Sequence, residues 1–278
     1  MKTSLKELLF ALVAFTLSYS VAHITEIEIV KDAVLLAFLI QWVLFVPAYI
    51  FQTEKFYDLS GSLTYISVVS FCFYNNYESN NINLGNLIIS LTIIIWAIRL
   101  GSFLFIRIKK AGEDIRFREI KKSPSRFFMT WTLQGMWVSL CSACALAGIA
   151  NGIVINAYFY IGIVIFMIGF TTEIIADNQK SIFRKDPYNK DKFISSGLWK
   201  YSRHPNYLGE LLFWFGICLI GINSDAAPIL IILCPIPMMM LFVFVSCPLM
   251  DERSLKNRSD YQEYMEKTSQ LLLLPPKE

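Results

Sequence analysis

Long, nearly uninterrupted runs of apolar residues constrain this chain more than any other feature. A run of about 18 or more apolar residues can cross the roughly 30 Å hydrocarbon core of a bilayer as an α-helix. The chain contains eight such runs, at residues 7–24, 33–51, 59–75, 83–106, 128–149, 153–176, 206–223 and 226–248. The sequence therefore predicts an all-α protein, a polytopic transmembrane helix bundle of about eight spans, rather than one or two soluble domains.

Two of these runs differ from a standard membrane span. The third, 59–75, is short and contains Ser62, Thr64 and Ser67, so a tilted, interfacial or protein-facing helix is expected there. The first, 7–24, is preceded by two lysines, as in a signal peptide, but a poor cleavage site and another apolar run follow it. We interpret the first run as a retained span.

The lysines and arginines follow the positive-inside rule when the N-terminus is placed in the cytosol. In that orientation all but two of the 25 basic residues fall in cytosolic segments, most of them in the loops 107–127 and 177–205. The exceptions are Lys31, in an outside loop, and Arg99, within a span. The sequence thus predicts an integral membrane protein with both termini cytosolic, in the endoplasmic reticulum of a eukaryote or the inner membrane of a bacterium.

The cysteines and the net charge exclude several other classes of protein. All six cysteines lie within or at the edge of predicted spans. Cys141 and Cys144 have redox-like spacing, but they lie in an apolar helix, so we interpret them as small buried residues. No metal site is expected. The net charge of +3 and the basic loops are explained by topology, so the bilayer is a predicted partner and nucleic acid is not.

Polar groups gather near the cytosolic ends of five predicted spans. They are Arg99, Gln134, Glu173 with Asp177, Asn206 with Glu210, and Asp251 with Glu252. Ionisable residues within spans are costly and mark functional sites by default. Five helices with such groups at one depth predict a cytosol-facing cavity in the C-terminal half. A structural alternative stays open, in which these residues pair with one another or extend to the interface.

Residues 197–210 form the most informative segment. Pro205 suits the first turn of a helix, so the residues just before it lie at the positive end of that helix. Arg203 and His204 add donors suited to phosphate or carboxylate. Asn206 and Glu210 face inward, where Glu210 could pair with a cofactor amide or hydroxyl. The segment predicts a site for an anion and a polar group without naming the reaction.

Residues 198–207, with Gly209 and Glu210, resemble the signature of the membrane-bound steroid 5-alpha-reductase-like family. They are most similar to its uncharacterised DUF1295 branch. Further segments fit the same pattern: 56–62, 99–104 with Arg107, 112–117, 176–180, and 251–255 followed by Tyr261, Tyr264, Thr268 and Ser269. The resemblance divides the chain into N-terminal transmembrane helices, 1–52, and a reductase-like membrane domain, 53–278, with a cofactor-binding core at about 96–278.

This resemblance implies an enzyme that reduces a carbon–carbon double bond conjugated to a carbonyl, with NADPH bound from the cytosolic side. The cofactor would supply the hydride, while the protein supplies orientation and electrostatics. The residues implied to bind NADPH are Arg99, Arg107, Asp177, Arg184, Lys192, Tyr201, Arg203, His204, Asn206, Tyr207 and Glu210.

The chain departs from the steroid-reducing members at one informative position. Those members place a Tyr three residues before the Arg that Arg99 matches, whereas this chain has Trp96, which cannot protonate a carbonyl oxygen. Tyr57 or Asp58 could supply the acid that the reaction needs, with an interfacial anchor as the alternative role of Tyr57. The expected substrate is a lipid-like small molecule, either steroid-like or a lipid enone or enoyl chain.

Two other functions stay open. Membrane methyltransferases acting on isoprenylcysteine or phospholipids share an Arg-His-Pro motif followed by Tyr and Gly, and they bind S-adenosylmethionine, whose carboxylate could use Arg203. The third function is a non-enzymatic lipid-binding or transport protein. Transporters usually place their site at the membrane midplane between repeats, and no repeat is visible here. The sequence does not indicate an oligomeric state.

Overall fold

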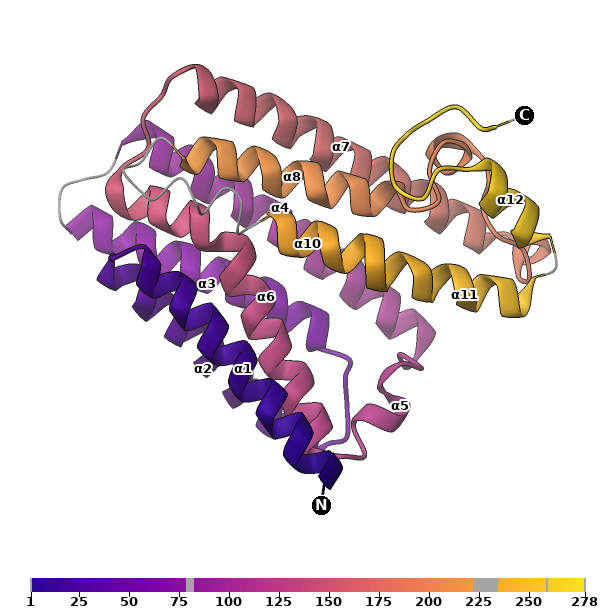
Figure 1. Cartoon of the computed structure of the whole chain (residues 1–278), viewed down its shortest axis with the longest axis horizontal. Coiled ribbons are helices and arrows are strands. Elements are labelled where there is room, and N and C mark those ends of the chain that lie inside the picture. Colours follow the sequence, from indigo (N-terminus) through magenta and orange to yellow (C-terminus); the bar gives the residue numbers. More distant parts are fainter. Residues whose placement is uncertain (1, 79–82, 223–234, 259, 278) are drawn as a thin grey trace. The chain divides into compact units, whose positions relative to one another are not determined.

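The computed structural model describes residues 2–78, 83–222, 235–258 and 260–277 (Figure 1). Every element of regular secondary structure in these ranges is a helix, which confirms the predicted all-α class. Contacts divide the chain into two compact units. The first is Met1–Phe159 with Ile220–Leu230, and the second is Tyr160–Leu219 with Ile231–Glu278. The domain boundary predicted after residue 52 stays a prediction.

The first unit is built around one central helix. Its helices are α1 (Lys2–Ile24), α2 (Glu28–Ile50), α3 (Tyr57–Glu78), α4 (Leu84–Ala111), the short α5 (Phe117–Ile120) and α6 (Pro124–Asn151). α1, α2, α3 and α4 all contact α6. Residues 138–149 of α6 are buried and mostly small, so neighbouring backbones can approach it closely. The cysteine interpretation is confirmed here, because Cys141 and Cys144 are free and buried.

Polar residues connect α3 to its neighbours inside this unit. The Gln134 amide of α6 donates to the Tyr57 carbonyl (3.1 Å) and accepts from the Ser60 hydroxyl (3.2 Å). On the other side, the buried Gln41 amide of α2 donates to the Thr64 hydroxyl (2.8 Å). Interhelical hydrogen bonds of this kind stabilise helix pairs where lipid offers no alternative partner. The polar character of α3 is therefore explained by its protein neighbours, as expected for the third run.

The asparagine-rich end of the α3–α4 region holds the C-terminal end of α6. Asn83 caps α4 by accepting from the Asn86 N–H (2.9 Å), and its amide donates to the Ile153 carbonyl (3.0 Å). The fully buried Asn86 accepts from the Ile153 N–H (2.8 Å) and donates to the Ile149 carbonyl (3.2 Å). These bonds satisfy backbone groups where α6 ends, next to Gly152 with its φ of 88°.

Asn86→Ala should lower the free energy of unfolding by about 2 kcal/mol, because a buried backbone N–H left without an acceptor costs about 1–3 kcal/mol. Thermal unfolding of the detergent-purified protein measures this loss. Asn178→Ala, at an exposed position of a different helix, is the matched control. Equal melting temperatures for the two variants would contradict the anchoring role of Asn86.

The second unit contains two long helices and a C-terminal helical segment. The long helices are α7 (Ala157–Lys185, from Tyr160 onward) and α8 (Pro205–Gly221, up to Leu219). The C-terminal segment comprises α10 (Pro235–Leu241), a π-helical turn (Phe242–Ser246), α11 (Cys247–Asn257) and α12 (Tyr261–Lys267). The π-turn ends two residues before Pro248, which has no N–H to continue the α-helical ladder.

Glycines bring α7 and α8 together. A Cβ added to Gly209 would lie 2.6 Å from the Glu173 backbone nitrogen, and one added to Gly169 would lie 2.4 Å from the Phe213 nitrogen. Seven residues further along each helix, a Cβ added to Gly216 of α8 would lie 2.6 Å from the Gly162 carbonyl oxygen of α7. Only residues without a side chain allow two helix backbones to pack at this distance. The helix pair is therefore held at a separation that no larger residue at these positions would permit.

Among the described residues, six helices are long and apolar enough to cross a membrane. They are Thr3–Ile24, Glu28–Ile50, Leu84–Ala111, Pro124–Asn151, Ala157–Lys185 and Pro235–Asn257. The protein is a multi-pass integral membrane protein. The predicted runs 59–75 and 206–223 form α3 and α8, which fall outside this set, and the first part of run 226–248 lies outside the described residues. The count of eight spans is not confirmed.

The structure also corrects the predicted loop at 177–205. α7 continues to Lys185, so the first part of this segment is helical. The reason is local, because no helix-breaking residue occurs before Pro187. Arg184 consequently lies on a helix rather than in a loop, and Asp177 lies on the same helix, as its grouping with Glu173 predicts.

Candidate functional site

Three carboxyl groups lie within electrostatic range of one another on the α7–α8 pair of the second unit. Glu173 and Asp177 on α7 are 3% and 8% exposed, and Glu210 on α8 interacts electrostatically with both. Their closeness follows from the glycine packing, since Gly209, next to Glu210, lies against the backbone of Glu173. Like charges gathered in a partly buried place disfavour folding and are typical of functional sites. Glu173 was not among the predicted cofactor ligands, although its four-residue spacing from Asp177 pointed to it.

Two further predicted ligands lie in the first turn of α8. Asn206 is half-buried and stands four residues before Glu210, so both belong to one face of the helix. Tyr207 stacks between His204 (5.6 Å between ring centroids) and Phe242 (4.4 Å). Its hydroxyl donates to the sulfur of Met250 (3.2 Å). The ring of Tyr207 therefore packs between neighbouring residues, and its role as a cofactor ligand stays a prediction.

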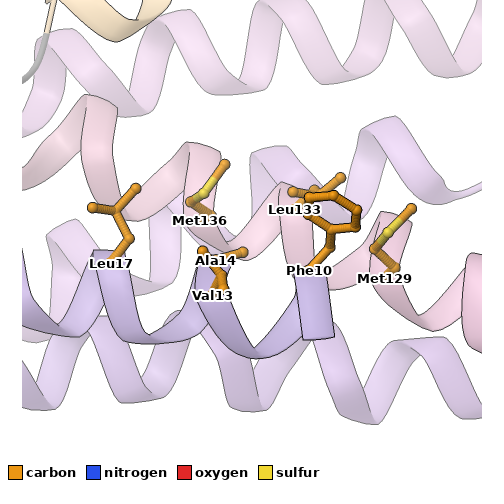
Figure 2. A pocket seen from close by; sticks show the side chains of 7 residues that line it. All are labelled: Phe10, Val13, Ala14, Leu17, Met129, Leu133 and Met136. Atoms are coloured by element: carbon orange, nitrogen blue, oxygen red, sulfur yellow. The ribbon is translucent and has the colours of Figure 1, made fainter. Parts of the chain in front are cut away.

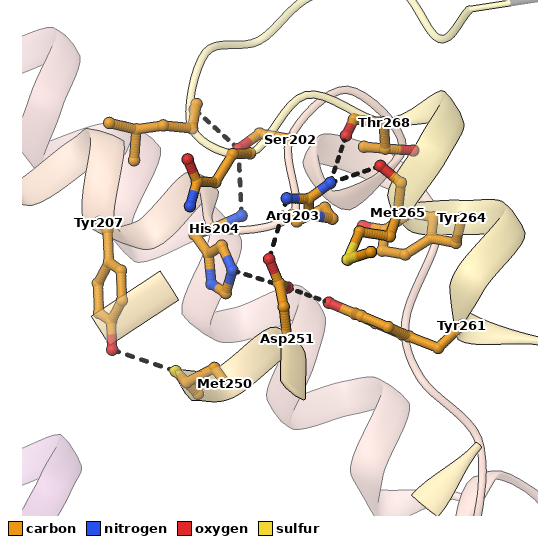
Figure 3. A network of polar contacts seen from close by, with 12 residues as sticks. Ser202, Arg203, His204, Tyr207, Met250, Asp251, Tyr261, Tyr264, Met265 and Thr268 are labelled. Carbon is orange, nitrogen blue, oxygen red and sulfur yellow. Dashed lines mark hydrogen bonds and ion pairs between the residues drawn. The ribbon is translucent and has the colours of Figure 1, made fainter. Parts of the chain in front are cut away.

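Arg203 and His204 are engaged by a carboxylate of the same unit (Figure 3). The buried Asp251 accepts from the Arg203 guanidinium (2.9 Å), lies 3.2 Å from His204 Nε2, and accepts from the Tyr261 hydroxyl (2.6 Å). Burial and the bond to Asp251 raise the pKa of Tyr261 far above its ordinary value. The two signature residues thus face α11 and α12, while their role as cofactor ligands stays a prediction.

The C-terminal tail runs along the same signature. Arg203 donates from its side chain to the carbonyls of Met265 (2.5 Å) and Thr268 (3.0 Å), and from its backbone to that of Ser269 (2.9 Å). The Ser202 hydroxyl donates to the Leu271 carbonyl (2.8 Å). Backbone groups in an irregular tail need such partners, so the signature and the tail complete each other's hydrogen bonding.

The short turn at the start of the signature, Gly197–Lys200, is attached to α7. The Trp199 indole donates to the Ala176 carbonyl (3.1 Å), and the Leu198 N–H donates to the Gln179 side chain (2.9 Å). The Lys180 ammonium lies over the Trp199 ring at 4.3 Å, a cation–π contact. Segment 176–180 of α7 therefore has two roles. Asp177 belongs to the group of three carboxyl groups, while Ala176, Gln179 and Lys180 contact the Gly197–Lys200 turn.

Gly197→Ala should lower the free energy of unfolding by about 2–3 kcal/mol. Gly197 has a φ of 61°, which costs an L-residue about 1 kcal/mol, and an added Cβ would lie 2.4 Å from the Gln179 amide. Gly112→Ala is the matched control, because Gly112 has a φ of 85° and open space around its Cβ position. Thermal unfolding should show a clearly larger loss at Gly197, and equal losses would argue against the close contact with Gln179.

The remaining predicted ligands of the second unit, Arg184, Lys192 and Tyr201, are exposed. Arg184 lies at the C-terminal end of α7, and Lys192 lies in the loop that follows it. Tyr201 directly precedes Ser202, with the Lys200 ammonium 5.8 Å from its ring centroid. These side chains are accessible to a ligand in solution, and their contact with a cofactor stays a prediction.

Four predicted site residues belong to the first unit. Arg99 lies 5.3 Å from the Phe103 ring on α4, and Arg107 is exposed near the end of that helix. The Tyr57 hydroxyl donates to the Thr130 carbonyl (3.0 Å) within an aromatic cluster, and burial raises its pKa well above the ordinary value. Burial also raises the pKa of Asp58, against the opposing effect of Arg107 and Arg116.

Glu54 is a polar residue of the first unit that sequence reasoning missed. Its side chain is buried, and it accepts from the Lys121 ammonium (2.6 Å) and the Asp114 backbone N–H (2.9 Å). Asp114 in turn binds Arg116 through its carboxylate. Glu54 therefore attaches the polar segment 112–123 to the connection between α2 and α3. Its position in a short turn between two apolar runs carried no signal of this burial.

An apolar groove of about 390 Å³ lies between α1 and α6 (Figure 2). Its lining is Phe10, Val13, Ala14, Leu17, Met129, Leu133 and Met136. Because this lining has no charged side chain, the groove does not suit a phosphorylated cofactor. The polar cavity that the sequence predicts in the C-terminal half stays a prediction. In the part of the chain that the structure describes, no cluster of His, Cys, Asp or Glu could hold a metal ion.

Comparisons with known proteins place the chain in a family. It is 34% identical over 82 residues to "Probable O-methyltransferase ustE" of Ustilaginoidea virens, which is 29% of each chain. It is 32% identical over 84 residues to "Uncharacterized protein C594.04c" of Schizosaccharomyces pombe, which is 24% of each chain. The matched segments thus span less than a third of either relative, and no solved structure matches. A family model described as "Protein of unknown function (DUF1295)" matches residues 12–268, so the chain belongs to the DUF1295 family.

Proposed function

We propose that this protein is a membrane-embedded, NADPH-dependent reductase of a conjugated carbon–carbon double bond in a lipid-like or steroid-like substrate. The observation that carries the proposal is the group of three carboxylates, Glu173, Asp177 and Glu210, beside the Asn206 turn of α8. The resemblance to membrane steroid reductases supplies the reaction class. The site is expected on the cytosolic side of the membrane.

The polar side chains of the second unit suit the groups of this cofactor. Carboxylates accept hydrogen bonds from an amide or from ribose hydroxyls, and Asn206 can both donate and accept. Exposed basic side chains, including Arg184 and Lys192, belong to the same unit and suit phosphate groups. Arg203 would contribute less, since its charge is already paired with Asp251.

The charge of the carboxylate group favours a reductase over a methyltransferase. When bound, NADPH supplies a hydride and its nicotinamide ring becomes positively charged. Glu173, Asp177 and Glu210 would stabilise positive charge that increases toward the transition state, which accelerates a reaction. With a sulfonium cofactor, the same carboxylates would stabilise a positive charge that disappears during methyl transfer. They would then assist binding and oppose the reaction.

A methyltransferase using S-adenosylmethionine is the second candidate. One specific observation favours it: a relative with 34% identity over 82 residues bears the name "Probable O-methyltransferase ustE". The Arg203–Tyr207 region also has the Arg-His-Pro motif of membrane methyltransferases. The carboxylates could hold the ammonium and sulfonium groups of this cofactor in its ground state.

Tyr57 and Asp58 stay the two proposed sources of the acid that the reduction needs. Burial raises the pKa of Asp58, and the Tyr57 hydroxyl donates its proton to the Thr130 carbonyl.

Titration calorimetry of the detergent-purified protein with NADPH, NADH and S-adenosylmethionine tests the proposal. We expect saturable binding of NADPH, with weaker binding of NADH because it lacks the 2′-phosphate. Binding of S-adenosylmethionine without NADPH would overturn the reductase in favour of methyl transfer. Binding of none of the three would reject both candidate functions.

A further inference from the structure

We propose that Asp251 is a positioning residue: it holds Arg203 and His204 against the C-terminal tail and thereby fixes the start of α8, which carries Asn206 and Glu210. The effect on cofactor binding rests on the proposed function of this site. The structural part of the proposal does not depend on which cofactor binds.

The first line of evidence is the number of donors that converge on one carboxylate. Asp251 is 4% exposed, and three donor groups from two segments lie within 3.2 Å of it: Arg203, His204 and Tyr261. A buried carboxylate is tolerated when it is paired and hydrogen-bonded in this way. Removing its charge would leave the buried Arg203 guanidinium without its counter-charge.

The second line of evidence is the continuity of the hydrogen bonds beyond Asp251. The Tyr264 hydroxyl donates to the Trp199 carbonyl, and the Leu274 N–H donates to the Tyr201 carbonyl (3.2 Å). Together with the bonds from Ser202 and Arg203 to residues 265–271, they connect four of the five residues of segment 199–203 to the C-terminal segment. α8 begins directly after this segment, at Pro205.

These contacts give Arg203 and His204 a different role from the one that the motif alone indicates. Their polar atoms face α11, α12 and the tail in Figure 3. A guanidinium that already binds a carboxylate and two carbonyls attracts a phosphate less strongly, because the carboxylate neutralises its charge and several of its N–H groups are occupied. Arg203 and His204 therefore hold the start of α8 in place, and ligand binding falls to Asn206 and Glu210, further along the same signature.

Asp251→Asn tests this role, because it keeps the size of the side chain and removes its charge. Glu252→Gln is the matched control: the neighbouring carboxylate is exposed and pairs with Lys256 on the surface. Hydrogen exchange on the full chain in detergent, without cofactor, should be at least about tenfold faster in residues 199–209 and 261–274 of Asp251→Asn. Exchange in Glu252→Gln should match the wild type, and equal exchange in the two variants would overturn the proposal.

NADPH affinity provides the second readout. Asp251→Asn should bind NADPH about tenfold more weakly than the wild type, and Asp251→Glu, which restores the carboxylate, should recover most of that loss. If Asp251 served only to fill space, the order would be reversed, since Asn matches Asp in size and Glu does not. Unchanged NADPH affinity in Asp251→Asn, with a wild type that binds, would overturn the positioning role.

The two proposals fail separately. A wild type that binds no NADPH rejects the reductase, while the hydrogen exchange of Asp251→Asn still decides whether Asp251 holds Arg203 and His204 against the tail. Should Asp251→Asn not yield folded protein, Tyr261→Phe takes its place, because it removes one donor to Asp251 and keeps the buried ring. Faster exchange in residues 199–209 of that variant supports the proposal, and unchanged exchange overturns it.

Discussion

Glu210→Gln should weaken NADPH binding by at least about tenfold while leaving the protein as stable as the wild type or more stable. Glu210 lies within electrostatic range of Glu173 and Asp177, so a neutral amide of nearly the same size at this position adds no repulsion to the group. The same change removes an acceptor for the cofactor and reduces the negative potential of the site. A tenfold loss corresponds to about 1.4 kcal/mol of binding free energy.

Calorimetry and thermal unfolding on the same detergent preparation separate the two effects of Glu210→Gln. Glu252→Gln is a suitable control, because it removes a carboxylate from an exposed surface pair with Lys256. That control should change neither affinity nor melting temperature by a measurable amount. Full NADPH affinity in Glu210→Gln would remove Glu210 from the site. A large drop in stability would instead show that Glu210 takes part in a structural ion pair.

Gly209→Val should lower the free energy of unfolding by about 3 kcal/mol, the upper end of the usual cost of overpacking. The reason is the position of its Cβ, which would lie within 2.6–2.9 Å of backbone atoms of Glu173 and Gly169. Backbone atoms cannot rotate away as a flexible side chain can, so α7 and α8 must separate. Because Glu173 and Glu210 belong to these two helices, cofactor binding should fall together with stability.

Gly209→Ala provides a graded test of the same contact. Alanine raises helix propensity by about 1 kcal/mol relative to glycine, so any net loss must come from the clash with α7. We expect a net loss of about 1–2 kcal/mol in thermal unfolding. Phe215→Ala, at an exposed position of α8, controls for substitution on this helix. A stabilising effect of Gly209→Ala would show that α7 and α8 do not pack through Gly209.

The sequence predicted those features that depend on local properties of the chain. Hydrophobicity over about 20 residues depends on neighbours in sequence, and six apolar helices correspond to predicted runs. Helix starts were also local, as at Pro205, whose fixed backbone suits a first turn and which begins α8. The motif at 198–210 predicted membership of the DUF1295 branch, and the family match over residues 12–268 confirms that assignment.

Features that depend on a partner distant in sequence could be seen only in the tertiary structure. Arg203 and His204 are residue types typical of an anion site. Their pairing with Asp251, which lies 47 residues beyond His204 in the chain, depends on how α11 packs. Glu54 lies in a short turn, and its burial depends on contacts with Asp114 and Lys121, which are 60 and 67 residues away in the chain.

The same division explains the candidate site. The four-residue spacings of Glu173 with Asp177 and of Asn206 with Glu210 were visible in the sequence, because one helix sets them. The meeting of those two faces was decided by the close packing of Gly169 and Gly209, which is a property of two helices together. By itself the sequence determined which segments are apolar helices and where their polar groups lie. Tertiary structure decided which of those groups meet, because charges and hydrogen bonds are satisfied by neighbours in space rather than along the chain.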